Sequence, residues 1–355
     1  MFWSVDPAYT VQKAISYGFC IIYPALLIRA FGLSESLWLI WAVGAVILIA
    51  SAIFAVIGSD FALMKGAHEG LWRGFFSHKN KFGPFALWML LLSIALPPTD
   101  KVRQALVLTV KVVAVVSIVF SGSATALMLL VLSYSVYVVF KILLQSNVTP
   151  ILGSLSIVFA IVTGVTLIAT FTPMVLELMG RDLTLTGRVP LWQAAIPHTL
   201  AHPFGFGFGI GASEAALTDI RTATGWDVAP NVHNGFIELA LSLGWAAVVV
   251  FYSWLASNFI FITSTRKLFF QYSAVIAAIA AGYFGESFTE SRAGANLQFP
   301  LFLIYYLALS RTLLAQDATE TVFDQTKRKW RQDRVSVIAQ EASTYPALEA
   351  KHNQA

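Results

Sequence analysis

The polar stretch between two hydrophobic blocks carries the side chains best suited to chemistry. Arg188 follows Gly187 early in this stretch, and His233 stands near its end, directly before Asn234 and an apolar run. Arginine presents a planar fork of donors that suits phosphate and carboxylate oxygens. A histidine with a pKa of about 7 can take a proton from a hydroxyl. Each residue also has a structural interpretation: Arg188 contacting lipid headgroups, and His233 packing beside a helix that Asn234 caps.

The segment 202–211, between these two residues, alternates glycine with apolar residues. It does not match the dinucleotide-binding pattern, because Ile210 stands where that pattern needs glycine and no strand precedes it. Glycines permit sharp turns and close approach of the backbone. The segment therefore predicts a re-entrant loop packed on helices, a role compatible with lining a substrate site. His202, at its start, is a candidate substrate-binding residue.

The composition indicates a membrane scaffold around this stretch. Of the 355 residues, 57% are hydrophobic and only 12% are charged, whereas a soluble domain carries about 25% charged residues. The net charge of +4 comes from Lys and Arg at the ends of apolar runs and in the C-terminal segment, which indicates membrane topology rather than nucleic-acid binding. The single cysteine, Cys20, suggests neither a disulfide nor a metal site.

The apolar runs predict an all-α, polytopic transmembrane helix bundle over residues 1–314, because only helices satisfy the backbone of such runs in lipid. About nine runs approach the length of roughly 20 residues that crosses the hydrocarbon core. They lie near 14–31, 37–57, 83–97, 104–121, 124–144, 151–173, 235–262, 270–286 and 297–314.

The charges of the short loops predict the orientation of the bundle. Lys101, Arg103 and Lys141 fall on one side if the spans alternate, and positive loops are cytoplasmic. The large loop 174–234 then faces the periplasm. The polar segment 315–355 is predicted to be a cytoplasmic tail that is partly disordered.

The segment 58–82 is expected on the periplasmic side although it is cationic. It carries Lys65, Arg73, Lys79 and Lys81, against the positive-inside rule. These cations either face an anionic substrate or belong to a tight loop that does not control topology. We take Arg73, Lys79 and Lys81 as candidate substrate-binding residues.

A second group of ionisable residues lies at the outer end of the eighth predicted span. It consists of Glu286, Glu290 and Arg292. Ionisable residues at that depth are functional candidates, and Glu286 and Arg292 are taken as substrate-binding candidates. The alternative is an Arg–Glu pair that holds a loop.

The motifs of the large loop, in this order and spacing, resemble the signature of the O-antigen ligase and polymerase superfamily. They are Gly187-Arg188, Leu191-Trp192, His202-Pro203-Phe204-Gly205, Gly207, Gly209, His233-Asn234-Gly235, Glu238 and Gly244. The stretch Leu71 to Gly83, with His78-Lys79-Asn80 before a span, is similar to a second feature of the family, typical of its exopolysaccharide-polymerase branch. The resemblance covers about residues 40–310.

The resemblance implies a metal-independent glycosyltransferase of the GT-C type without a cofactor. It implies an enzyme of the bacterial inner membrane that acts at the periplasmic face on glycans carried by undecaprenyl pyrophosphate. A polymerase joins lipid-linked repeat units, and a ligase moves the finished glycan onto lipid A–core. The catalytic histidine and the early arginine of the family's loop match His233 and Arg188, and Asn234 joins the candidate substrate-binding residues.

The chain departs from the family in two respects. Many members have an additional arginine where the stretch 121–126 stands here without one, so a cation of the 58–82 segment is expected to assist Arg188. The chain also has about three spans fewer before the His-Lys-Asn stretch than is usual in the family. Because the chain is short, a non-catalytic subunit that works with other polysaccharide export proteins is one alternative. A transporter of lipid-linked sugars is the other alternative, although no internal repeat supports it.

The predicted topology is tested by chemical labelling. A single cysteine placed by Thr218→Cys, in a Cys20→Ser background, should react with an impermeant maleimide in cells whose outer membrane has been permeabilised. Labelling only after the inner membrane is broken would show that the large loop is cytoplasmic, and a periplasmic active site would be wrong.

Overall fold

The computed structural model describes residues 3–96, 100–145, 188–208, 214–226, 229, 231–264, 270–288, 290 and 303. Regular structure in these ranges is helical, apart from one isolated β-bridge between Leu63 and Trp72. The predicted all-α class is confirmed. The predicted span 151–173, the span 297–314 apart from Leu303, the tail 315–355 and Arg292 lie outside the described residues.

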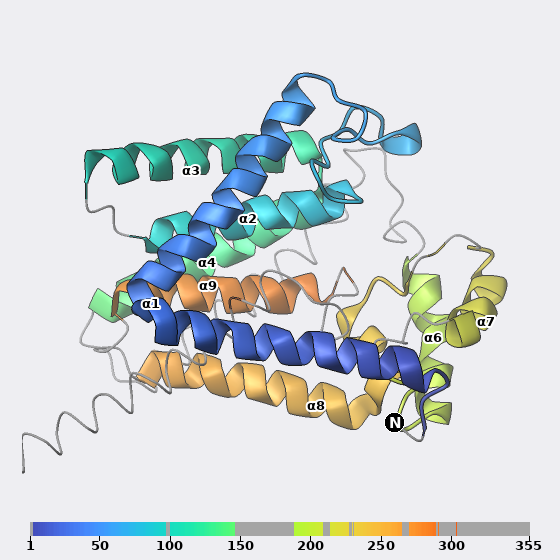
Figure 1. Ribbon diagram of the computed structural model, residues 1–355. Helices are drawn as coiled ribbons and strands as arrows, with labels where there is room; N and C mark the ends of the chain where they lie inside the picture. Colours follow the sequence, from blue (N-terminus) through green and yellow to red (C-terminus); the bar gives the residue numbers. More distant parts are fainter. Residues whose placement is uncertain are drawn as a thin grey trace, which may run out of the picture. The chain divides into compact units, whose positions relative to one another are not determined.

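The helices fall into two groups (Figure 1). Six correspond to predicted spans: α1 (Pro7–Val56), α2 (Lys79–Ala95), α3 (Lys101–Ser121), α4 (Ala124–Gln145), α8 (Gly235–Ser264) and α9 (Phe270–Glu286). Two lie inside the segment expected to be a loop: α6 (Arg188–Ala201) and α7 (Glu214–Thr224). The large loop therefore contains helices of its own.

Five stretches of the described residues are long and apolar enough to cross a membrane, which confirms a polytopic helical membrane protein. They are Pro7–Gly32, Ser34–Val56, Lys101–Ser121, Ala124–Ile142 and Gly235–Asn258. The first two belong to α1, which breaks at Gly32, where φ is 75°. The first span begins earlier than predicted, because Pro7 opens the helix and the Asp6 side chain accepts a hydrogen bond from the Tyr9 N–H at 3.0 Å.

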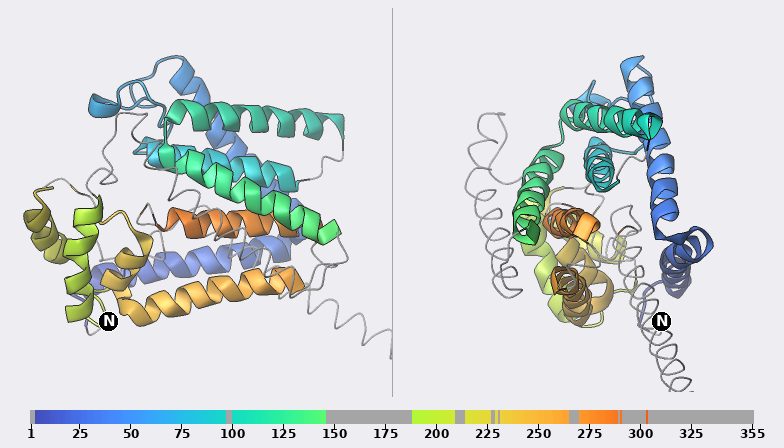
Figure 2. Two further views of the ribbon diagram at one scale, coloured as in Figure 1. Left: turned by 180° about the vertical axis from the view of Figure 1, so that it is seen from behind. Right: turned by 90° about the vertical axis from the view of Figure 1, so that its left-hand side faces the viewer.

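Helix α2 is the buried centre of the bundle. It contacts α1, α3, α4 and α9, and Figure 2 shows it enclosed by them. Its 17 residues span about 26 Å, less than the roughly 30 Å of the hydrocarbon core. Close packing depends on glycines: a Cβ on Gly83 would lie 2.7 Å from the Ser121 hydroxyl, and one on Gly282 of α9 would lie 2.6 Å from the Trp88 ring.

Helix α8 breaks at Gly244, where φ is 81° and ψ is 168°. The glycine-rich segment packs against this break. The Phe206 N–H donates to the Leu241 carbonyl at 2.7 Å, and the Gly207 N–H donates to the Ser242 carbonyl at 3.0 Å. The described part of this segment, with Gly205 and Gly207, therefore packs on the bundle, as predicted. It supplies donors to carbonyls that the broken helix leaves without helical partners.

The break gives a stability prediction. Gly244→Ala should destabilise the protein by roughly 1–3 kcal/mol or more, because an L-residue is strained in that backbone region and its Cβ would overlap the Pro203 carbonyl oxygen. The measurement is the thermal midpoint of the detergent-solubilised protein. Gly18→Ala is the matched control, since no atom beyond its chain neighbours and its own helix backbone lies within 4 Å of the added Cβ. An equal midpoint for the two variants would contradict the observed break.

Candidate active site

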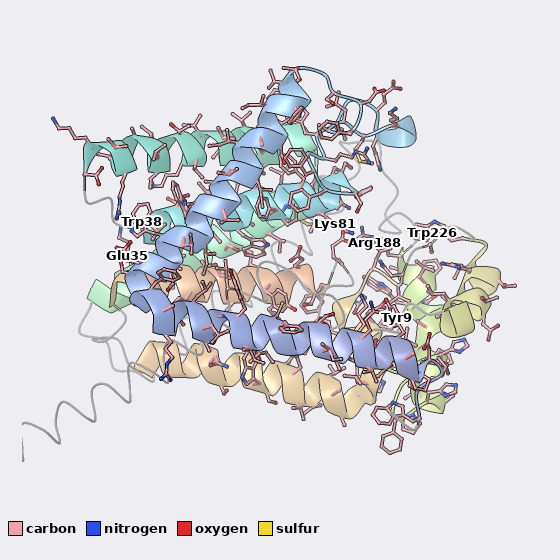
Figure 3. All side chains as sticks on the ribbon, in the orientation of Figure 1. Tyr9, Glu35, Trp38, Lys81, Arg188 and Trp226 are labelled. Carbon is pink, nitrogen blue, oxygen red and sulfur yellow. The ribbon has the colours of Figure 1, made fainter. Side chains whose placement is uncertain are left out.

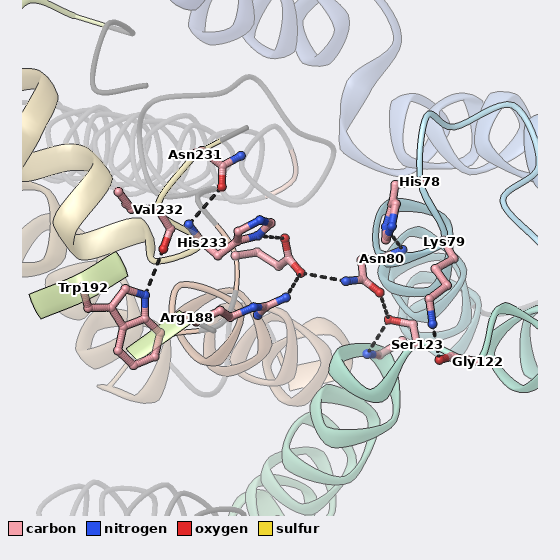
Figure 4. Close-up of polar contacts among 12 residues, drawn as sticks. His78, Lys79, Asn80, Gly122, Ser123, Arg188, Trp192, Asn231, Val232 and His233 are labelled. Atoms are coloured by element: carbon pink, nitrogen blue, oxygen red, sulfur yellow. Dashed lines mark hydrogen bonds and ion pairs between the residues drawn. The ribbon is translucent and has the colours of Figure 1, made fainter. Parts of the chain in front are cut away.

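The carboxylate of Glu290 joins three parts of the chain, and Figure 4 labels its partners Asn80, Arg188 and His233. Its Oε1 lies 3.4 Å from Nη2 of Arg188 and accepts a hydrogen bond from Nδ2 of Asn80 at 3.1 Å. Its Oε2 lies 3.6 Å from Nδ1 of His233. The side chains of Glu290, Arg188 and His233 are only 10%, 14% and 17% exposed. These ionisable groups are therefore largely shielded from water, and their interactions are strengthened accordingly.

These three partners of Glu290 each stand at the beginning of a helix. Asn80 is in the first turn of α2, Arg188 is the first residue of α6, and His233 closely precedes α8. These residues lie at one end of the bundle. Figure 3 shows Arg188, Lys81 and Trp226 at that end, and Glu35 at the opposite one.

A small apolar core inside the large loop holds Arg188 and His233 together. Its buried members come from α6, α7, the start of α8 and the segments between them: Leu191, Ala195, Phe206, Leu217, Ile220, Ala229, Val232, Ile237 and Leu241. The indole of Trp192 donates to the Val232 carbonyl at 2.9 Å. This bond ties the N-terminal part of α6 to the residue before His233.

The backbone and the ring of His233 are both fixed. Its φ is 50°, and its N–H donates to Oδ1 of Asn231 at 2.9 Å. Its ring stacks on Trp226 with 5.8 Å between centroids and 12° between planes. Because Nδ1 faces a carboxylate, this nitrogen is expected to keep the proton, which leaves Nε2 as a proton acceptor.

Asn234 caps α8, as the sequence predicted. Its Oδ1 accepts hydrogen bonds from the backbone N–H groups of Phe236 and Ile237, at 3.0 and 3.1 Å. The Gly235 N–H donates to the Ser287 carbonyl at 2.7 Å. The hydrogen bond from Gly235 joins the beginning of α8 to Ser287, which follows the end of α9. It thereby brings His233 near Glu290.

The His-Lys-Asn stretch contacts three different elements. His78 caps α2, because its Nδ1 accepts the Asn80 N–H at 3.2 Å. Lys79 is buried, and its Nζ donates to the carbonyl of Gly122, at the end of α3, at 2.8 Å. Asn80 contacts Glu290, and its Oδ1 accepts a hydrogen bond from Ser123, before α4, at 3.2 Å.

The environment of His78 favours the neutral form of its imidazole. Burial lowers its pKa below the ordinary value, and the charges of His68, Lys79 and His233 lower it further, while Glu290 acts in the opposite direction. A neutral ring is what the α2 cap needs, since a protonated Nδ1 cannot accept the Asn80 N–H.

The structure brings Arg188 and His233 together but not all of the other predicted site residues. His202 follows the far end of α6, about 20 Å of helix from Arg188. The centroid of its ring lies 4.2 Å from the centroid of the Phe206 ring. The Nε of Arg73 donates to the Phe61 carbonyl at 3.0 Å. Lys81 is exposed, and Glu286 is fully buried at the end of α9.

Three residues around the predicted pair make contacts that the sequence does not predict: Glu290, Asn80 and Trp226. The sequence places Glu290 among the ionisable functional candidates, with an Arg–Glu loop pair as the alternative, but indicates no partner for it, and it gives Asn80 only as part of a motif. The sequence pattern indicates no role for Trp226. No local signal identifies these contacts, because Asn80 lies 210 positions before Glu290 and Arg188 lies 102 positions before it.

Comparison with known proteins identifies one family. Residues 109–252 match the O-antigen ligase family. This range extends from within α3 to within α8, so it includes Arg188 and His233, whereas Asn80 and Glu290 lie outside it. No curated protein and no solved structure matches the chain.

The family match confirms the predicted relationship to the O-antigen ligase and polymerase superfamily, although it covers less than half of the chain. Together with the apolar helices, it supports a multi-pass membrane enzyme of the ligase or polymerase type. The catalytic roles of the individual residues stay predictions.

The ion pair of Glu290 and Arg188 gives a second stability prediction. Glu290→Gln should lower stability on the order of 3 kcal/mol, because it leaves a largely buried guanidinium without its carboxylate. Arg188→Met combined with Glu290→Gln should cost less than the sum of the two single changes. Thermal midpoints of the purified variants measure both effects.

The control for this cycle is Asp60→Asn, which removes one partner of the exposed pair between Asp60 and Lys65. It should leave the midpoint unchanged, because exposed pairs contribute little. Strict additivity of the Arg188 and Glu290 changes would show that the two side chains do not interact.

Proposed function

We propose that this protein is a membrane glycosyltransferase that polymerises oligosaccharide repeat units carried by undecaprenyl pyrophosphate. The observation that carries the proposal is the bridge of Glu290 between Arg188 and His233. One residue suits an anionic leaving group and the other suits a hydroxyl acceptor, and a single carboxylate orients both. The family match supports the same class of reaction.

In the proposed step, the hydroxyl oxygen of an acceptor sugar attacks the anomeric carbon of the donor sugar. The bond between that carbon and the phosphate oxygen breaks, and undecaprenyl pyrophosphate leaves with the electron pair. The hydroxyl proton moves to Nε2 of His233. General base catalysis of this kind contributes about 10²–10⁴-fold. Arg188 stabilises the negative charge that develops on the pyrophosphate.

The charges of the cluster suit this step. Before the reaction, the positive charge of Arg188 and the negative charge of Glu290 cancel, and a general base acts from its unprotonated form. When His233 takes the proton, Glu290 stabilises the imidazolium, and the three side chains together carry one positive charge. That charge appears as the leaving group becomes more negative, so its stabilisation is stronger in the transition state than in the ground state.

A second cation is proposed to hold the pyrophosphate with Arg188, because the additional arginine of many family members is missing. Arg73, Lys79 and Lys81 are the candidates. Lys79 contacts the end of α3, and Arg73 contacts the Phe61 carbonyl. We favour Lys81, because it is the exposed residue of the three whereas Lys79 is buried, so a charged substrate has access to it.

The proposed site is at the periplasmic face of the bacterial inner membrane. The large loop and the beginning of α2 share one end of the bundle, because Asn80 and Arg188 contact the same carboxylate. A ligase that transfers the glycan to lipid A–core would use the same chemistry with another acceptor. The lipid-linked glycans of a deletion strain separate the two: single repeats indicate a polymerase, and long chains on the carrier indicate a ligase.

The role of His233 is tested by substitution. His233→Ala should abolish polymer while the protein reaches the membrane in normal amount. His233→Gln should fail as well, since an amide retains hydrogen bonding but does not accept the proton. Glycan chain length, read on gels from a complemented deletion strain, measures the effect.

His202→Ala is the matched control, because His202 belongs to the same loop but contacts Phe206 rather than Glu290. It should affect chain length far less than either change at His233. Wild-type chain lengths from His233→Gln would mean that His233 only packs on Trp226, and the proposed base would be wrong.

A further inference from the structure

Helix α6 exposes an apolar face although it lies in the large polar loop. After Arg188, its residues 189–201 include no Asp, Glu, Lys or Arg. Ile196 and Leu200 stand one turn apart and are 41% and 69% exposed, and Phe204, just beyond the helix, is 71% exposed. Contiguous apolar surface of this kind marks a contact with a protein or a membrane.

The neighbouring helix of the same loop has the opposite character. The eleven residues of α7 include Glu214, Asp219 and Arg221, and Thr218 is exposed. Both helices bury their other face in the same apolar core, through residues such as Leu191 and Leu217. The difference between their outer faces therefore indicates different surroundings rather than different packing.

The apolar face of α6 continues the outer surface of α8. The indole of Trp245, in α8, donates to the hydroxyl of Thr199, in α6, at 3.0 Å. Trp245 is 39% exposed, and Val249 and Val250, on the next turn of α8, are 65% and 69% exposed. The stretch of α8 that holds them is long and apolar enough to cross the membrane, so lipid is the expected neighbour of these residues.

The N-terminal segment adds further aromatic and apolar surface to the same region. The Val5 N–H donates to the Phe206 carbonyl at 2.9 Å, which places residues 3–5 beside the glycine-rich loop. Trp3 is 48% exposed and Val5 is 54% exposed. Tryptophan is enriched where membrane meets water, so Trp3 and Trp245 suit the headgroup level of the bilayer.

The direction of α6 fits such a position. It runs across the ends of α8 and α9 rather than along them, as both Figure 1 and Figure 2 show. A helix that lies across the ends of membrane spans is oriented along the membrane plane. We infer that α6 lies in the boundary between lipid headgroups and acyl chains, with Ile196, Leu200 and Phe204 in contact with lipid.

This position has a consequence for the active site, which rests on the proposed function. Arg188 is the first residue of α6, so anchoring the helix in the boundary fixes the depth of the guanidinium. The pyrophosphate of a lipid-linked glycan lies at the headgroup level, because its polyprenyl chain is in the bilayer. The apolar face of α6 would thus hold Arg188 at the height of its ligand.

Depth-dependent fluorescence quenching tests the inference. Leu200→Cys, Ile196→Cys and Thr218→Cys are each made in a Cys20→Ser background, labelled with bimane and reconstituted into phosphatidylcholine–phosphatidylglycerol vesicles. Nitroxide near the top of the acyl chain should quench bimane at positions 196 and 200 at least threefold more than at position 218. Aqueous iodide should show the reverse order.

Iodide quenching at position 200 as strong as at position 218 would place α6 in water and overturn the inference. Shielding from both quenchers, with disulfide-linked dimers of Leu200→Cys, would place a second copy on this face and overturn it equally. The measurement needs no turnover, so its failure is distinct from a failure of the proposed glycosyl transfer.

Discussion

A carboxylate in a largely buried position organises this end of the protein. Removing Glu290 from water is costly unless charged groups and donors replace the water. The replacements come from the beginning of α2, from the beginning of α6 and from the residue before the α8 cap. The membrane bundle and the large loop must therefore assemble together, since neither alone supplies all of the groups that surround this carboxylate.

The main chain of α8 imposes the second constraint. A helix that breaks at Gly244 leaves carbonyls without their helical donors, and such groups cannot remain unsatisfied in an apolar environment. The loop at Phe206 and Gly207 provides the donors, and only glycine fits where a Cβ on Gly205 would overlap the backbone of Ser242. The glycines thereby place the end of α6 against α8, while Arg188 at its other end reaches Glu290.

The parts that were predictable from the sequence follow from local physical chemistry. Apolar length identified α3, α4, α8 and α9, and Asn234 identified the start of α8, because hydropathy and capping act over a few neighbouring residues. Helix α6 was not predicted, since Pro190 and Pro197 interrupt a short pattern and its apolar face is too brief to resemble a span. The contacts of Glu290 with Asn80 and Arg188 were not predictable, because each joins residues more than a hundred positions apart.

The direction of the helices adds an electrostatic argument. The beginnings of α2, α6 and α8 converge near Glu290, and each helix N-terminus carries partial positive charge. Arg188 is a cation at such an N-terminus, which is unfavourable by itself. The arrangement therefore concentrates positive potential that an anion must balance, and Glu290 supplies one negative charge at that place. A pyrophosphate carries more negative charge than one carboxylate, so the same convergence that stabilises Glu290 would also favour the leaving group of the proposed reaction.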